Sequence, residues 1–300
     1  MAPRRSALGA KIDGPRLALV LANGAYTRRA PLSRPVGVSL ELRRKLAAIG
    51  FQVSGADDQD LAGMRRATVQ WLRLVEDAVQ ASEAEADPQP PLLFFAYCGH
   101  GCADCFFPVD CPKHAPPEET YRFFEDFLLR LYEVLGWRGR HRYERSAGRR
   151  SEDTFLQGEC SWHPPHARVV AVVESCRRLA PEEQRAYEAQ RARVASGKRH
   201  LLPSLAAHRP DLAQVGGAEW DAIRLAFLAR LGPGAPELLL ALSSESTTPS
   251  YDVVFLRSIT EMIDRPVRLG GILERAGLDT ERRTGHRQRP VLLALGGGDH

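Results

Sequence analysis

Long apolar runs are missing from this sequence of 300 residues. The first apolar stretch, Leu17 to Ala22, has six residues and ends in Asn-Gly, whereas a membrane-spanning helix needs about 20 apolar residues. The residues before it contain no apolar segment of the length that a secretory signal requires. We therefore expect no membrane partner and a cytoplasmic location.

Lysine and strong net charge are also scarce. Only four of the 41 cationic side chains are lysines, and the formal net charge is +4. A small excess spread over a large surface does not favour binding to a nucleic-acid backbone. We therefore expect no nucleic-acid partner.

Cysteines are few, and they are crowded rather than spaced. Four of the six lie between Cys98 and Cys111. This spacing is unlike the disulfide framework of a secreted domain, so we expect reduced thiols. The composition of 44% hydrophobic and 26% charged residues is that of a globular protein and excludes wholesale disorder.

Short apolar runs alternate with amphipathic segments along the chain. The expected strands are 16–22, 51–53, 92–97, 168–173, 238–242 and 290–295. The expected helices are 36–49, 60–81, 118–135, 181–194, 218–231, 253–263 and 267–276. After Tyr97 we expect a loop, with a hairpin within it as an open alternative. The alternation predicts an α/β fold with a mostly parallel sheet of about six strands and helices on both faces.

Two of the expected strands end in residues that carry chemistry. One is followed by Cys98-Gly99-His100-Gly101 and the other by Glu174-Ser175-Cys176-Arg177. Reactive groups of an open α/β sheet lie outside the carboxyl ends of its strands. If these two strands are neighbours, an imidazole and a thiol face each other, as a cysteine nucleophile and its base must. The sequence therefore predicts a dyad of His100 and Cys176.

Glycines on both sides of His100 suggest a close approach of the backbone to a substrate carbonyl. The amides of Gly101 and Cys176 would then form an oxyanion hole for a tetrahedral intermediate. Both amides follow strand ends, like the dyad itself. Together these residues predict acyl-transfer chemistry.

The order strand-Gly-His-Gly, then strand-acid-x-Cys-Arg, resembles the caspase-like cysteine peptidases, closest to the paracaspase and metacaspase branch. The resemblance continues in LALVLANGAY, in FFPVD after the histidine, in LLLALSSE and in Gln288-Arg289-Pro290, and covers roughly residues 16–295. It implies a caspase-like three-layer sandwich forming one domain over 16–300, after a short tail of residues 1–15. Within that domain it implies a large-subunit-like part at 16–180, a helical insertion or linker at 181–235 and a small-subunit-like part at 236–300.

The resemblance also implies a function: a cysteine endopeptidase that cleaves proteins and peptides after Arg or Lys. His100 would be the general base, Cys176 the nucleophile, and Gly101 with Cys176 the oxyanion donors. Glu174 and, by a looser alignment, Asp252 would line the pocket for the basic side chain by charge pairing.

Three departures from the family pattern keep a second interpretation open. Glu174 stands where aspartate is usual, Gly37 stands where a further acid is expected, and 76 residues separate His100 from Cys176. The alternative is a catalytically inactive scaffold that pairs through the edge strand 291–295. An active enzyme can form a homodimer through the same strand.

Metal binding and self-processing are further open points. Cys102-x-x-Cys105 is half of a zinc site, but no second Cys-x-x-Cys exists. Cys98, His100, Cys111 and His114 lie nearby in the sequence, but Cys160, His163 and His166 would have to complete the site. We expect no cofactor; calcium dependence stays open, with Asp57, Asp58 and Asp60 as the acidic candidates. Lys198-Arg199 is either a self-cleavage site or part of an uncut helical insertion.

Overall fold

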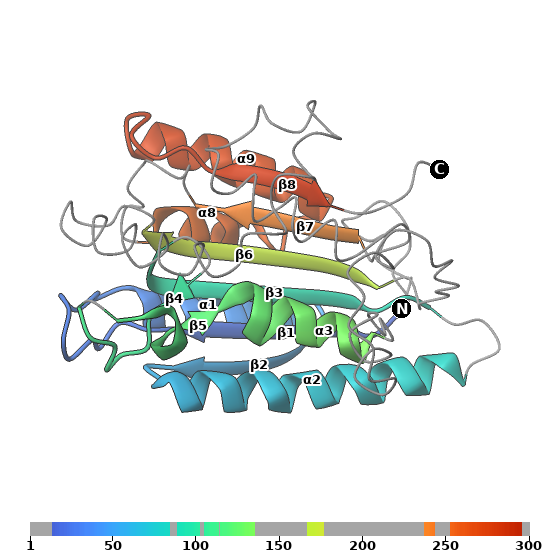
Figure 1. Cartoon of the computed structure of the whole chain (residues 1–300). Coiled ribbons are helices and arrows are strands. Elements are labelled where there is room, and N and C mark those ends of the chain that lie inside the picture. Colours follow the sequence, from blue (N-terminus) through green and yellow to red (C-terminus); the bar gives the residue numbers. More distant parts are fainter. Residues whose placement is uncertain are drawn as a thin grey trace, which may run out of the picture.

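The computed structural model describes residues 14–84, 89–102, 105–113, 115–135, 167–176, 237–243 and 253–295. Within these ranges the chain forms a mixed, mostly parallel sheet of eight strands, whose main path has the order β2-β1-β3-β6-β7-β8 (Figure 1). The strands are β1 (Arg16–Ala22), β2 (Gln52–Asp57), β3 (Leu92–Cys102), β4 (Cys105–Phe106), β5 (Tyr121–Arg122), β6 (Arg168–Cys176), β7 (Glu237–Leu242) and β8 (Val291–Leu295). Within the main path only β8 runs antiparallel to its neighbour. The short strand β4 pairs with the last two residues of β3, and β5 pairs with β4.

Helices cover both faces of this sheet. One face packs against α2 (Leu61–Glu83), the π-helical turn η2 (Phe123–Leu128) and α3 (Leu129–Val134). The other face packs against α1 (Pro35–Ala48), α8 (Val254–Met262) and α9 (Leu269–Arg283). In Figure 1, α3 crosses in front of the strands, while α1 and α8 lie behind them. The structure confirms the predicted α/β class and the two helical layers.

The apolar strands explain why both faces need a cover. Successive residues of a strand point to opposite faces. Phe95 and Tyr97 of β3 belong to the core under α2 and α3, whereas Phe94 and Ala96 belong to the core under α1 and α8. A strand buried on both faces is therefore a continuous apolar run, which is how β1, β3 and β6 stand out in the sequence.

Several expected elements have the predicted position. β1 has the predicted bounds, and α2 begins directly after Asp60. The Asp60 carboxylate accepts a hydrogen bond of 2.6 Å from the Gly63 amide, which caps the helix. Local signals of this kind are enough to position a helix start.

Two expectations are wrong. The segment after Tyr97 is strand rather than loop: β3 continues to Cys102, because its last residues pair with β6 on one side and β4 on the other, and the antiparallel pairing with β4 confirms the hairpin alternative. Residues 118–135 do not form one helix, since Tyr121 and Arg122 pair with β4. Downstream, Asp126 accepts bonds from the Arg122 amide at 3.0 Å and from Arg65 at 3.1 Å. Tertiary pairing overrides helical periodicity here.

The expected helices 181–194 and 218–231, the linker 181–235 and Lys198-Arg199 lie outside the described residues. In the part of the chain that the structure describes, no helix combines the length and the apolar character needed to cross a bilayer.

The parallel strands β1, β3, β6 and β7 all end at one side of the sheet, which we call the carboxyl edge.

Candidate active site at the carboxyl edge

The ends of β3 and β6 lie side by side at the carboxyl edge. Their register pairs Cys98 with Glu174, Gly99 with Ser175, and His100 with Cys176. Neighbouring strands are about 4.8 Å apart, so the fold brings the backbones of His100 and Cys176 together across 76 residues of chain. The two residues of the predicted dyad are direct register partners.

The imidazole of His100 is half-buried and oriented by the loop after β1. Its Nε2 atom lies 2.9 Å from the carbonyl oxygen of Ala30. A carbonyl can only accept a hydrogen bond, so Nε2 carries the proton in the neutral ring. Nδ1 is then the nitrogen that carries no proton in the neutral ring.

The glycines beside His100 have a packing role that the sequence did not reveal. A Cβ atom on Gly99 would lie 2.6 Å from the hydroxyls of both Tyr26 and Tyr97. A Cβ atom on Gly101 would lie 2.7 Å from the carbonyl oxygen of Cys105. At both glycines, the space that a side chain would need is thus occupied by atoms of the protein itself.

The amide of Gly101 points toward β6. The Phe107 amide donates to the His100 carbonyl at 3.0 Å, which makes Gly101 and Phe106 a non-hydrogen-bonded pair of β3 and β4. The Gly101 amide therefore faces away from β4, on the side of the Cys176 backbone. This is the side on which an oxyanion hole was predicted.

Glu174 is buried, with 2% of its surface exposed, and its carboxylate joins three segments. The Leu256 amide, in the first turn of α8, donates to Oε2. The Gln288 side-chain amide donates to Oε1 at 3.2 Å and also to the Ser243 carbonyl at 2.9 Å. Free amides and the positive dipole end of a helix stabilise a carboxylate, so Glu174 serves α8 as an N-terminal cap.

The start of α8 lacks a cap of its own. Its N-cap position is Val253, which has no side-chain acceptor and a left-handed backbone with φ of 58°. A β-branched residue is strained in that region. Glu174, 82 positions away from Leu256, supplies the missing acceptor.

The remaining sequence-predicted residues have separate fates. Asp252 lies outside the described residues. Each calcium candidate has a partner within the protein: Asp57 pairs with Arg43, Asp58 accepts from the Gly24 and Ala25 amides, and Asp60 caps α2.

The zinc hypothesis gains no cluster. Cys98, Cys105 and Cys111 are buried, reduced cysteines. In the ranges that the structure describes, no group of three or more histidine, cysteine or acidic side chains could hold a metal ion. His114, Cys160, His163 and His166 lie outside those ranges.

Sequence reasoning missed four residues of this site: Tyr26, Ala30, Tyr97 and Gln288. The only signals were weak ones: a tyrosine four residues after β1, a tyrosine at the end of the apolar run, and an amide between arginines. Their partners lie far away in sequence, so no local pattern could have identified their roles.

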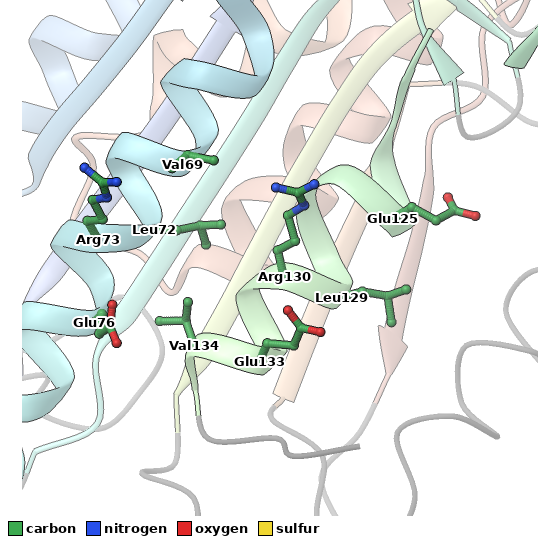
Figure 2. Close-up of a pocket in the computed structure, with 9 residues that line it drawn as sticks. All are labelled: Val69, Leu72, Arg73, Glu76, Glu125, Leu129, Arg130, Glu133 and Val134. Atoms are coloured by element: carbon green, nitrogen blue, oxygen red, sulfur yellow. The ribbon is translucent and has the colours of Figure 1, made fainter. Parts of the chain in front are cut away.

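A hollow of about 490 Å³ lies elsewhere, between α2 and the η2–α3 segment (Figure 2). It is lined by Val69, Leu72, Arg73, Glu76, Glu125, Leu129, Arg130, Glu133 and Val134. Side chains of both charges surround it, and none of the predicted site residues is among them. The chemistry-bearing residues gather at the carboxyl edge instead.

Comparisons with known proteins add little to this geometry. No family model matches the chain, and no curated protein matches it. Among solved structures, protein GSU0716 from Geobacter sulfurreducens matches with 14% identity and a TM-score of 0.46, over 95% of both chains. A likeness at this level carries no argument about function.

Proposed function

We propose that this protein is a caspase-like cysteine endopeptidase of the paracaspase and metacaspase type, cleaving after Arg or Lys. The observation that carries the proposal is the register of β3 and β6, which sets His100 opposite Cys176 at the ends of adjacent parallel strands. The element order strand, helix, strand, histidine strand, cysteine strand and closing strand is also the order that the sequence resemblance implies.

In the proposed reaction, Nδ1 of His100 takes the proton of the Cys176 thiol, and the thiolate attacks the scissile carbonyl. The amides of Gly101 and Cys176 stabilise the resulting oxyanion. The imidazolium then protonates the leaving amine, and a thioester remains on Cys176. Water hydrolyses the thioester, with His100 as the base, and the free enzyme is restored.

Glu174 supplies the charge for specificity in this proposal. Its buried carboxylate accepts from the Leu256 amide and the Gln288 side chain, and we propose that it also pairs by charge with the cationic side chain of the substrate. Arginine is the favoured partner because its planar fork matches a carboxylate. Asp252 is proposed as the second acid of the same pocket.

The test is hydrolysis of fluorogenic peptides with Arg, Lys, Asp or Ala before the scissile bond, under reducing conditions, with and without calcium. We expect cleavage after Arg and Lys that falls at least about 10³-fold in Cys176→Ala and in His100→Ala. Matched controls are Cys111→Ala, which removes a buried, reduced cysteine, and His286→Ala, which removes a surface imidazole. Equal cleavage by wild type and Cys176→Ala, or none by either, would refute the proposal.

One observation favours a second candidate, an inactive scaffold. Among the described strands β8 has β7 as its single neighbour, so it forms one end of the sheet. An open strand edge is a template for pairing with another chain. A dimer by light scattering, together with silence on the whole peptide panel, would favour the scaffold. A dimer that cleaves would fit an enzyme that pairs through the same edge.

A further inference from the structure

Two tyrosines hold the backbone of His100 from both ends of the residue. The His100 amide donates to the Tyr26 hydroxyl at 2.7 Å. The Tyr97 hydroxyl donates to the His100 carbonyl oxygen, also at 2.7 Å. The two hydroxyls lie 3.3 Å apart. These four groups close a ring of hydrogen bonds around one residue.

The direction of this ring follows from its two backbone members. An amide can only donate and a carbonyl can only accept. The Tyr26 hydroxyl therefore accepts a hydrogen bond from the His100 amide and donates one to the Tyr97 hydroxyl. The Tyr97 hydroxyl in turn donates to the His100 carbonyl oxygen. The Phe107 carbonyl oxygen, at 3.4 Å, is a second and longer acceptor for the Tyr97 hydroxyl.

Burial keeps both hydroxyls protonated. Removal from water raises the pKa of Tyr26 and of Tyr97 well above the usual value for a phenol. The ring of hydrogen bonds therefore persists over the whole range in which an imidazole titrates. Proton transfer at His100 leaves its support unchanged.

Tyr26 also contacts the imidazole itself. The two ring centroids are 4.6 Å apart with an angle of 50° between the planes. The loop that carries Tyr26 continues to Ala30, whose carbonyl accepts from Nε2. One loop thus sets both the backbone and the ring orientation of His100.

This loop is rigidly attached to the rest of the carboxyl edge. The Asp58 carboxylate accepts from the amides of Gly24 and Ala25 at 2.7 and 2.8 Å. The buried Asn23 side chain donates to the Phe107 carbonyl at 3.0 Å and accepts from the Gln59 amide at 2.9 Å. A loop fixed in this way can position a catalytic group.

We infer that Tyr26 and Tyr97 are positioning residues that hold the His100 imidazole in register with Cys176. The inference rests on the proposed peptidase function. Gly99 is part of the same arrangement, because its missing Cβ leaves the space that the two hydroxyls occupy. Neither tyrosine takes part in proton transfer.

The test compares Tyr26→Phe and Tyr97→Phe with Tyr121→Phe. Tyr121 is an equally buried phenol, whose hydroxyl bonds to Thr68 Oγ1 at 2.7 Å instead. For each variant, kcat, KM and the pH dependence of kcat/KM are measured on an Arg peptide. Site-resolved alkylation of Cys176 by iodoacetamide, from about pH 5 to pH 9, follows the same dyad without turnover.

We expect Tyr26→Phe to lower kcat by about ten- to a hundred-fold, with KM within about two-fold, because a small displacement of a catalytic group affects mainly the chemical step. Tyr97→Phe should have a smaller effect, since the Phe107 amide still donates to the His100 carbonyl. Both should shift the pH profiles of turnover and of alkylation, and Tyr121→Phe should shift neither.

Wild-type kcat and pH profiles in both tyrosine variants would overturn the inference, as would an equal loss in Tyr121→Phe. The two proposals can fail separately. If no peptide is cleaved but the alkylation profile of Cys176 shifts in Tyr26→Phe, the peptidase proposal fails and the positioning role stands. If wild type cleaves and neither profile shifts, only the positioning role fails.

Discussion

The carboxyl edge is held by different chemistry on its two sides. Around His100 the partners are neutral hydroxyls and backbone groups, from Tyr26, Tyr97 and Ala30. Around Glu174 a buried carboxylate binds the Leu256 amide and the Gln288 side chain. On the first side, the His100 imidazole can gain or lose a proton while the two hydroxyls keep their hydrogen bonds to its backbone. The second is built around one buried acidic side chain.

Removal of the acidic side chain of Glu174 should have the largest effect on stability. Glu174→Ala leaves two buried donors without an acceptor and opens a cavity, so we expect a loss of about 3–5 kcal/mol in the free energy of unfolding. Chemical denaturation measures it. Glu274→Ala, on the exposed surface of α9, is the matched control and should change stability by less than about 0.5 kcal/mol.

Glu174→Gln separates charge from shape at the same position. It keeps the size and one acceptor, so more of the stability should survive than in Glu174→Ala, while the preference for Arg over Ala peptides falls by ten-fold or more, about 1.4 kcal/mol. Peptide kinetics measure the preference. An unchanged preference would show that Glu174 is only a cap for α8.

Gln288→Ala tests the amide that joins the ends of β6 and β7. Gln288 is fully buried, and its Nε2 atom donates to both Glu174 and Ser243, so we expect a loss of about 2–3 kcal/mol in stability. Peptide selectivity should weaken, because Glu174 loses a fixed partner, whereas the pH profile of kcat should stay. A shifted pH profile would mean that the two sides of the edge are coupled.

Gly99→Ala perturbs the side of the carboxyl edge that holds His100. The added Cβ would lie 2.6 Å from both tyrosine hydroxyls, and their displacement should lower stability by about 1–3 kcal/mol. We expect kcat to fall while the preference for Arg over Lys or Ala peptides is kept. Thermal denaturation and peptide kinetics give the two readouts, and Gly270→Ala, where nothing lies within 4 Å of the added atom, is the control.

The smallest expected effect on stability concerns the ion pairs of Glu261 in α8 and Asp279 in α9 with arginines of α9. Hydrogen bonds and charge from Arg283 hold the pKa of Glu261 below its usual 4.5. For Asp279, burial alone would raise the pKa, but bonds from Ser258 and Arg282 outweigh it and the pKa is lowered below 3.8. Both carboxylates therefore stabilise the fold fully above these usual values, and the contribution is lost as the pH falls through the lower, folded values.

These pairs are exposed to solvent, so the contribution of each is at most a few tenths of a kcal/mol and weakens with salt. Unfolding temperatures of wild type and Glu261→Gln, measured from about pH 7 down to pH 3, should converge at the acid end. A constant difference between the two proteins would contradict the assignment.

The sequence allowed much of the fold to be predicted, and only part of the site. Continuous apolar runs identified β1, β3 and β6, and Asp60 marked the start of α2, because these signals are local. The break in 118–135 depends on pairing with β4, which no local pattern encodes. His100 and Cys176 stand out because strand ends carry chemistry, yet the Gln288 partner of Glu174 lies 114 residues away and could only be found in three dimensions.

The register of β6 against β3 determines which residues at the carboxyl edge lie on the same face of the sheet. Glu174 and Cys176 are two residues apart on one strand and lie opposite Cys98 and His100, so all four positions share the same phase of the strand repeat. A single inserted residue between Arg168 and Glu174 would reverse that phase, moving the acid and the cysteine to the wrong side at once. One register therefore places all four residues at this edge, and a shift of the strand cannot move one of them without the other on the same strand.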